Sequence, residues 1–497
     1  MKRDVLTQLA LTSTLLLSMA CSSEETTKQE PTKGQQDTKE LTAFVVEDNS
    51  TKTRTTAEYD GSGLNFYWTE GDRLWVNNGT LIQDVSNTIN KSLVNNPTIT
   101  NAVKRTATAR FQFAGTFTAL SYPVRYTGKG STDGNKVTIK AAQTQAIPND
   151  ASHVAESGDC GIATAIKSGE QYNFTLEHKA AYLTFVPYSS QGAVSGAIIT
   201  QIKVTADKAV CGQFDFNDNG IDVDNSRPTT TPTNQSITLT LNSNATNTGF
   251  PIPANVVDAS KNAAVMVLAP GTYSTFTVEY TLHDNVTNKG GIITKTYNNL
   301  TLTAGKNRRV ATNLQVLDYS SWIQYRKWTA AGSSTAPTVN ELVYYMIYGN
   351  PHYDYNVPWA CNGNLYSSGL WLKKQAVIYN DLKAAGYNQL TSQAVMKNRY
   401  YPSPTHAGFD FRITRYHQRI YPPSGTPIST TDYFFLPSLG ALVPGNGAPL
   451  GSHGLYWSSN ATPDEAMFAY TMHFFPSFLD VNYTYKDSRQ CIARPFE

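Results

Sequence analysis

The sequence predicts a mainly β protein whose last part is an α+β module, and three observations support this prediction. A chain of 497 residues is about three times the length of an ordinary domain, so two or three domains are expected. Charged residues make up only 16% and aromatic residues 11%, a profile typical of secreted β proteins. Short segments rich in Thr, Val, Ile and Leu, separated by Gly, Pro and Asn, indicate strands joined by turns.

The charge balance excludes one class of partner. The chain has 40 Lys and Arg against 38 Asp and Glu, which gives a net charge of +2. A chain so close to neutrality has no overall electrostatic field that would attract a polyanion. No nucleic-acid partner is therefore expected.

Residues 1–20 are predicted to form a signal peptide. Lys2 and Arg3 precede an apolar stretch that is too short and too rich in Ser and Thr to span a bilayer. The end of this stretch, Leu17-Ser18-Met19-Ala20-Cys21, resembles a bacterial lipobox, which implies that Cys21 is lipidated and that residues 21–54 form a lipidated propeptide. Ser18 stands where that pattern usually has Leu, and a signal peptide with an incidental cysteine is the alternative.

The four remaining cysteines leave two alternatives. An exported protein could pair Cys160 with Cys211 and Cys361 with Cys491, because two of them fall in each half of the chain. Buried free thiols are the equal alternative, since four cysteines allow three connectivities. No CxxC pair occurs, so a zinc ribbon or a thioredoxin-like site is not expected.

Before residue 320 the pattern is that of β-sandwiches. In Ile237-Thr238-Leu239-Thr240-Leu241, apolar residues alternate with polar ones, so one face can pack on a core. A Thr- and Pro-rich loop from Ser226 to Asn234 divides this part, and sandwiches are expected over residues 55–225 and 226–318. The expected strands are Ala109 to Ala114, Tyr182 to Val186, Ile199 to Val204, Ser236 to Leu241, Ala263 to Leu268, Thr275 to Tyr280 and Ile292 to Tyr297.

A compositional break near residue 320 separates the last domain, residues 319–497. The final 177 residues contain 32 of the 56 Phe, Trp and Tyr residues of the chain. Thr338-Val339-Asn340-Glu341 has the spacing of a capping box before an apolar run that stops at Gly349, which predicts a helix. A second helix is expected from Lys374 to Ala385. Together with Gly- and Pro-rich segments, these helices indicate a loop-rich α+β domain.

Several segments of the first part carry a family resemblance. They are Thr53-Arg54-Thr55-Thr56, Leu64-Asn65-Phe66-Tyr67-Trp68, Glu70-Gly71-Asp72-Arg73-Leu74-Trp75-Val76, Ala109-Arg110-Phe111, Leu176-Glu177-His178-Lys179-Ala180-Ala181-Tyr182-Leu183, Cys211-Gly212, Ala269-Pro270-Gly271-Thr272-Tyr273 and Leu302-Thr303-Ala304-Gly305-Lys306. In this order they resemble fimbrillin-family pilins of type V pili, which implies a transthyretin-like β-sandwich. Each segment alone is also compatible with an ordinary turn or strand.

The resemblance implies assembly by strand exchange. In that family an arginine-specific protease removes an N-terminal strand, and a donor strand from another pilus subunit fills the groove, which is β-augmentation. Here the removable strand would be Leu41-Thr42-Ala43-Phe44-Val45-Val46, and cleavage would fall between Arg54 and Thr55. A solvated surface arginine is the alternative for Arg54. The implied location is the cell surface, in a fimbrium, with an outer-membrane lipoprotein as precursor.

A second resemblance lies in the last domain. Tyr433-Phe434-Phe435-Leu436-Pro437-Ser438-Leu439-Gly440, Gly454-Leu455-Tyr456-Trp457-Ser458-Ser459 and Asp487-Ser488-Arg489-Gln490-Cys491-Ile492-Ala493-Arg494 resemble the end of bacterial major-paralogous-type domains related to C-type lectins. This resemblance implies a lectin-like adhesive domain that contacts a host glycan or protein, with Tyr456 and Trp457 as candidate ligand aromatics. A core position for both is the alternative.

Catalytic and metal motifs are missing from the sequence. The patterns GxSxG, HExxH, GxxxxGK[ST] and GxGxxG do not occur, so no enzyme, cofactor or metal is expected. Asp215 to Gly220 matches the first half of a calcium loop, but Ser226 stands where the bidentate Glu would fall. A plain Asn/Gly turn is the favoured interpretation of that segment.

Together these observations predict a minor fimbrial subunit, at the tip or accessory, that acts as an adhesin. The sequence ends in Arg494-Pro495-Phe496-Glu497, and a proline there would remove one ladder hydrogen bond, which does not favour a donor strand. The alternative is a cell-anchored glycan-binding lipoprotein that does not polymerise.

Overall fold

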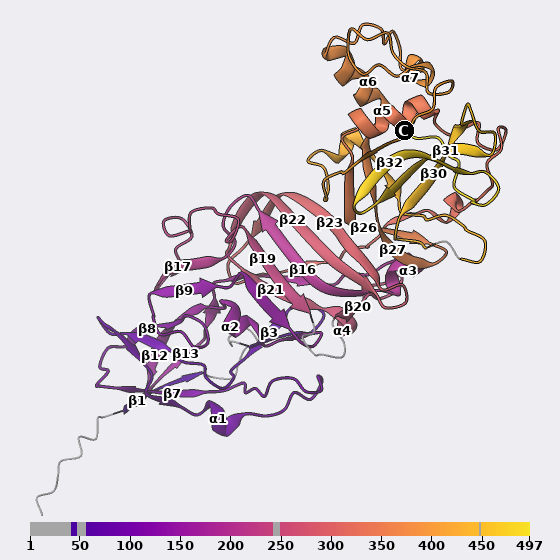
Figure 1. Cartoon of the computed structure of the whole chain (residues 1–497). Coiled ribbons are helices and arrows are strands. Elements are labelled where there is room, and N and C mark those ends of the chain that lie inside the picture. The colour runs from indigo at the N-terminus through magenta and orange to yellow at the C-terminus, as the bar shows by residue number, and fades with distance from the viewer. Residues whose placement is uncertain (1–40, 47–55, 242–248, 447–448) are drawn as a thin grey trace, which may run out of the picture. The chain divides into compact units, whose positions relative to one another are not determined.

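The computed structural model describes residues 41–46, 56–241, 249–446 and 449–497. These residues form a mainly β protein with several sheets and few helices (Figure 1). All seven strands expected from the sequence coincide with observed strands to within a few residues, and the mainly β prediction is confirmed. The described side chains gather in three large hydrophobic cores and one small cluster.

The first core lies under a nine-stranded sheet. Its strand order is β5-β4-β8-β12-β13-β1-β7-β6, with β14 paired to β12. Its buried residues are mainly aromatic and aliphatic side chains from the inner face of these strands. The members are β1 (Leu41–Val46), β4 (Trp75–Asn77), β5 (Leu81–Gln83), β6 (Ser86–Asn87), β7 (Arg110–Ala114), β8 (Ser121–Tyr126), β12 (Gly161–Ser168), β13 (Gln171–Phe174) and β14 (Glu177–His178), with the short helix α1 (Ile89–Ser92).

The second core is enclosed by four further sheets. The largest has the order β10-β19-β16-β22-β23, with β20 paired to β16, and the others are β21-β15-β24, β11-β2-β3 and β18-β17-β9. Their bounds are β2 (Thr56–Tyr59), β3 (Leu64–Tyr67), β9 (Lys136–Ile139), β10 (Ala142–Gln145), β11 (Asp150–Ala151), β15 (Ala181–Phe185), β16 (Ile198–Ala206), β17 (Gly212–Asn217), β18 (Gly220–Ile221), β19 (Ser236–Leu241), β20 (Phe250–Pro251), β21 (Ala264–Leu268), β22 (Gly271–Asp284), β23 (Lys289–Leu302) and β24 (Asn307–Val310), with helices α2 (Val154–Ser157), α3 (Gly192–Ser195) and α4 (Ala259–Asn262).

The first part of the chain therefore contains two cores, but the boundary between them does not lie at the residue that the sequence predicted. The sequence places the division at residue 226, whereas β10 pairs in parallel with β19 across that point, with Ala142 opposite Thr238. Strands β2 and β3, from the start of the expected first sandwich, also pack in the second core. The loop from Ser226 to Asn234 is thus a connection inside one core, because strands before and after it share one sheet.

The third core belongs to the last part of the chain and begins at Tyr319. Two four-stranded sheets, β25-β26-β27-β29 and β28-β32-β31-β30, contribute to it together with helices. The elements are β25 (Leu317–Asp318), β26 (His352–Cys361), β27 (Asn364–Lys373), β28 (Gln418–Ile420), β29 (Tyr433–Pro437), β30 (Gly454–Ala461), β31 (Phe468–Phe475), β32 (Phe478–Tyr485), α5 (Val339–Tyr348), α6 (Gln375–Ala384), α7 (Ala394–Asn398) and two short 3-10 helices, Ser320–Trp322 and Thr430–Asp432.

Both helices expected in the last domain are present. Helix α5 has Thr338 as its N-cap, and the capping box is complete, with the Thr338 side chain accepting from the Glu341 amide and the Glu341 side chain accepting from the Thr338 amide. Its C-cap is Gly349. Helix α6 spans the second predicted segment. The α+β composition of this domain is therefore as expected.

Candidate functional site

Strand β1 is an interior strand of the first sheet. It pairs with β7 in antiparallel orientation, with Leu41 opposite Ala114, and with β13 in parallel orientation, with Phe44 opposite Tyr172. Neither neighbour is close to β1 along the chain, so no hairpin joins β1 to the sheet. Two backbone ladders and side-chain packing therefore hold its place in the sheet.

The side chain of Phe44 fills a cage of aromatic rings. It is completely buried, and its ring stacks on Tyr172 with centroids 4.8 Å apart and planes 12° apart. Phe113 and Phe117 meet it edge to face at 4.9 and 5.3 Å, and Tyr122 lies at 6.5 Å. Edge-to-face and stacked rings at these distances attract one another beyond the effect of burial alone. Phe44 is thus the main anchor of β1.

Hydrogen bonds fix one wall of this cage. The Tyr172 hydroxyl donates to the carbonyl oxygen of Ala119 at 2.7 Å, while the Tyr122 oxygen accepts from the amides of Thr118 and Ala119, each at 3.0 Å. These two amides lower the pKa of Tyr122, whereas burial raises the pKa of Tyr172. The loop that carries Phe117 is therefore held by two tyrosines that themselves line the cage.

The two ends of β1 are held differently. Val46 is only 2% exposed, and its amide donates to the carbonyl oxygen of Ala109 at 3.1 Å. Ala43 is also buried, whereas Leu41 is half exposed. Near that end, the Thr42 hydroxyl donates to the carbonyl oxygen of Gly115 at 3.2 Å. The strand is thus anchored over Ala43–Val46 and loosely held at its first residue.

The chain resumes after β1 in a different core. Strand β2 begins at Thr56 and pairs with β3 and β11, and its residues Ala57 and Tyr59 are buried in the second core. The predicted cleavage residues Arg54 and Thr55 lie outside the described residues, as does the predicted lipidation residue Cys21. The five predicted residues Leu41, Ala43, Phe44, Val45 and Val46 lie together in one strand.

The cysteine pairings are not formed. Cys160, Cys211, Cys361 and Cys491 are all free and buried, which agrees with the alternative of buried thiols. Burial raises the pKa of Cys160 well above its usual value and raises the pKa of Cys211 and Cys361 to about 11. Thiols that stay protonated in an apolar core are unreactive.

The two candidate ligand aromatics of the last domain are core residues. Tyr456 is 1% exposed and its hydroxyl donates to the carbonyl oxygen of Pro437 at 2.6 Å. Trp457 is fully buried and its indole N–H donates to the carbonyl oxygen of Arg326 at 2.8 Å. Neither side chain can therefore stack on a ligand, because both rings and both polar groups have partners inside the domain.

The last residues of the sequence pack against the third core, with Phe496 partly buried and Glu497 exposed. Phe496 packs against Tyr345, Phe434 and Tyr456 at 5.5 to 5.9 Å between ring centroids. The carbonyl oxygen of Glu497 accepts from the Gln375 amide and from the Tyr345 hydroxyl, both at 2.9 Å. This segment is therefore held on several sides by the domain to which it belongs.

A buried polar cluster that the sequence analysis did not single out lies in the second core. Nδ1 of His178 lies 2.8 Å from a carboxylate oxygen of Asp159, which also accepts from the Tyr182 hydroxyl. Phe66 stacks on the His178 ring at 3.7 Å. The segment Leu176 to Leu183 contributes to the family resemblance, and inside the fold it supplies this fully packed polar anchor.

The described residues hold no group of three or more His, Cys, Asp or Glu side chains arranged to bind a metal ion. The half calcium motif forms the turn between β17 and β18, where Asp218 pairs with Arg125. Within the same residues, no helix is long and apolar enough to cross a membrane.

The comparisons with known proteins find weak structural likeness only. No family model matches the chain, and no curated protein matches its sequence. A candidate cell adhesion protein from Bacteroides ovatus is 13% identical, with a TM-score of 0.30, over 55% of this chain and 93% of that one. The fimbrial anchor protein Mfa2 from Porphyromonas gingivalis is 11% identical, with a TM-score of 0.20, over 52% and 82%. A fimbrial protein from Bacteroides ovatus is 9% identical, with a TM-score of 0.20, over 89% and 98%.

Proposed function

We propose that this chain is a minor fimbrial subunit, at the tip or accessory, which exchanges β1 for a donor strand of another subunit. The observation that carries the proposal is the interior position of a strand that no hairpin joins to its sheet. Such a strand can leave without unfolding its neighbours, and another strand can take its place.

Departure of β1 would leave a slot of the right size. Adjacent strands lie about 4.8 Å apart, so β7 and β13 would face each other across about twice that spacing. The edges of both strands would then present unpaired N–H and C=O groups, and the ring cage of Phe44 would be open to water. One incoming strand with a large apolar residue at the Phe44 position would satisfy both.

The segment from Cys491 to Glu497 supports the part of the proposal that concerns the tip. Its contacts with Tyr345 and Gln375 keep it in the third core, so it is unsuited to serve as a donor strand for a neighbour. This packing is compatible with a subunit at the tip or in an accessory position, which is the part of the proposal that it supports. The last domain would then contact a host or partner surface, and we propose no catalytic role for it.

N-terminal sequencing of the protein from purified surface filaments tests this proposal. The expected first residue is Thr55, because the proposed protease cuts after Arg54. Arg54→Ala should abolish incorporation into filaments, while Lys52→Ala, which removes a neighbouring charge, should not. Recovery only as an intact chain that starts at a lipid-bearing Cys21 would overturn the proposal in favour of a cell-anchored lipoprotein.

A further inference from the structure

One residue on the outward-facing side of β1 is buried although it does not point into a core. Side chains alternate along a strand, and Phe44 and Val46 point into the first core. Leu41, Ala43 and Val45 therefore point outward. Ala43 is nevertheless only 3% exposed, whereas Leu41 is half exposed and Val45 is partly exposed. Other side chains on the outer face of the sheet must therefore cover Ala43.

Two glutamine side chains flank Ala43 on this face. Gln112 of β7 and Gln171 of β13 lie opposite Ala43 in the two ladders of β1. Side chains of residues that lie opposite each other share one face of a sheet and are close neighbours. Both glutamines are partly exposed, as expected for outward-facing side chains. Ala43 thus lies at the bottom of a polar trough whose walls belong to β7 and β13.

A chain of side-chain hydrogen bonds closes this trough. One N–H of Arg110, which lies opposite Val45, donates to the side-chain oxygen of Gln171 at 3.4 Å. The side-chain amide of Gln171 in turn donates to the side-chain oxygen of Asn173 at 3.0 Å. Since β1 lies between β7 and β13 in the sheet, the first bond crosses over β1 and joins the two walls of the slot directly. We call Arg110, Gln171 and Asn173 the strap.

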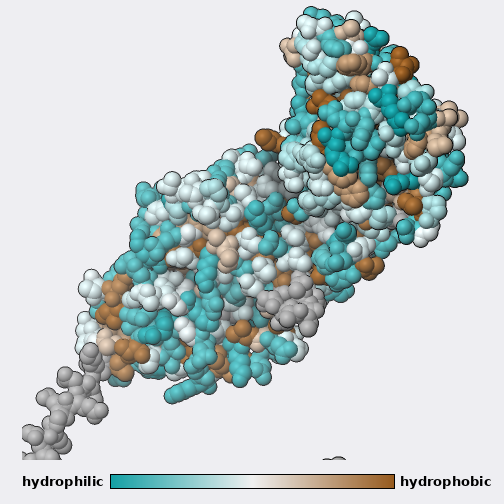
Figure 2. All heavy atoms as spheres, in the orientation of Figure 1, coloured by the Kyte–Doolittle hydropathy of each residue, from teal (hydrophilic) through white to brown (hydrophobic). Residues whose placement is uncertain are grey.

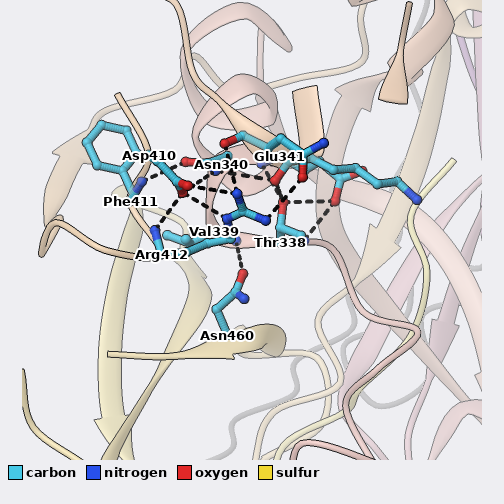
Figure 3. A network of polar contacts seen from close by, with 10 residues as sticks. Thr338, Val339, Asn340, Glu341, Asp410, Phe411, Arg412 and Asn460 are labelled. Carbon is cyan, nitrogen blue, oxygen red and sulfur yellow. Dashed lines mark hydrogen bonds and ion pairs between the residues drawn. The ribbon is translucent and has the colours of Figure 1, made fainter. Parts of the chain in front are cut away.

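The strap is a weak bridge, as a comparison with a second bridge in the molecule shows. In the last domain, Asp410 accepts from Asn340 at 3.0 Å and from Arg412 at 2.8 and 2.7 Å (Figure 3). Two of those bonds are short and join opposite charges, so they fix the side chains that they connect. The bond that crosses β1 is longer, has a neutral acceptor and is exposed to solvent, so it adds little stability. The strap therefore acts through the space that it fills above β1.

We propose that the strap makes the slot selective for strands with a small residue at the position of Ala43, directly before the large residue that fills the ring cage. A larger side chain at this position would collide with Gln171 and force the strap open. On the face shown in Figure 2, hydrophobic residues lie in small scattered groups, so that face has no broad apolar patch that could select a partner instead. The inference rests on the proposed function in that another strand must replace β1.

Substitutions in the full-length chain test the strap, with β1 itself as the strand whose fit is measured. Ala43→Leu should lower the protection of the β1 amides from hydrogen exchange at least about tenfold, because leucine does not fit under the strap. Ala43→Ser, which stays small, and Gln171→Ala, which removes the middle of the strap, should each lower it less than about threefold. Combining Ala43→Leu with Gln171→Ala should restore most of the lost protection, since leucine then has room.

Gln112→Ala is the matched control. Gln112 also flanks Ala43 but takes no part in the strap, so Gln112→Ala should improve the protection of Ala43→Leu less than about twofold. Equal rescue by Gln112→Ala, no rescue by Gln171→Ala, or full protection in Ala43→Leu alone would overturn the proposal. Amides of β31 and β32 should keep their protection in every variant, which checks that the third core is folded.

The outcomes separate this inference from the proposed function. If filaments contain a chain that starts at Thr55 but Ala43→Leu keeps full protection, only the strap fails. If the substitutions act as expected but filaments lack the protein, only the fimbrial proposal fails.

Discussion

Two segments at opposite ends of the described chain, β1 and the residues from Cys491 to Glu497, fill their cores by different means. Strand β1 inserts one aromatic side chain, Phe44, between strands that are remote in sequence, and the chain then moves to another core. The C-terminal segment inserts Phe496 and also bonds to helix residues of its own domain. Strand β1 is held by two ladders and one main side-chain anchor from strands remote in sequence, whereas the C-terminal segment contacts several elements of its own domain, and this difference is why we propose exchange for β1 alone.

The largest expected effect comes from removal of β1. A chain that starts at Thr55 lacks two ladders and the Phe44 anchor, so the amides of β7 and β13 should lose protection from hydrogen exchange by at least about a hundredfold. Amides of β31 and β32 in the third core should be unaffected. Unchanged protection in β7 would contradict the role given to β1, and a synthetic peptide of residues 41–46 should restore it.

A smaller loss is expected when only the anchor is changed. Phe44→Ala should destabilise the first core by about 3–5 kcal/mol, because a buried ring is replaced by a cavity inside a rigid cage. Val45→Ala, in the same strand but only half buried, should lower the free energy of unfolding by less than about 1.5 kcal/mol. Hydrogen exchange of the β7 amides, measured at increasing urea concentrations, gives the free energy of unfolding of the first core for both variants. Equal losses would show that backbone ladders, not the cage, hold β1.

The two regions should respond to acid with opposite sign. Burial lowers the pKa of His473 in β31 from 6.5 to about 3, and the nearby His453, Arg489 and Arg419 lower it further. The unfolded chain therefore binds a proton that the folded one refuses, so His473 makes the third core less stable as pH falls from about 6.5 to about 3. His473→Gln should flatten this loss.

Burial instead raises the pKa of Asp84 in the first core, although Arg73 pairs with it at 2.9 Å. The folded state then binds a proton more readily than the unfolded state, so mild acid stabilises this region, and the gain disappears as pH rises through the folded pKa. Protection factors of the β4 and β30 amides, corrected for the intrinsic pH dependence of exchange and followed from pH 7 down to pH 4, compare the two regions. A change of the same sign in both would contradict this account.

The smallest effect concerns the C-terminal segment. Tyr345→Phe removes the hydroxyl that donates to the Glu497 carbonyl oxygen and should lower the stability of the third core by about 1 kcal/mol. Because Phe496 and the Gln375 amide still hold the segment, it should stay protected from carboxypeptidase. Rapid trimming of this variant would show that the segment is held as loosely as β1.

Local chemistry explains what could be predicted from the sequence. The alternating residues of Ser236 to Leu241 predict a strand, and the capping box at Thr338 predicts the start of a helix. Both signals are contained in a few neighbouring residues, and the structure confirms both elements. The strand Leu41–Val46 was also predictable, since its residues are β-formers. The cage around Phe44 could not be predicted from the sequence, because Phe113 and Tyr172 are far apart along the chain and come together only where their strands pair with β1.

Long-range pairing also decides the remaining cases. Tyr456 and Trp457 take the core position that the sequence left as the alternative, because pairing of β30 with β31 places both inside the domain. The division expected at residue 226 failed because parallel pairing of β10 with β19 joins segments about a hundred residues apart, beyond the range of local patterns.

The mixed pairing of β1 has a consequence for the polarity of any replacement. Strand β1 forms one antiparallel and one parallel ladder, and a strand inserted in the reverse direction would also form one of each. Backbone hydrogen bonding alone therefore discriminates little between the two directions. In the proposed exchange, the order of side chains would have to select the direction, and the ring cage around Phe44, which lies off the centre of the strand, would fix the orientation of an incoming strand.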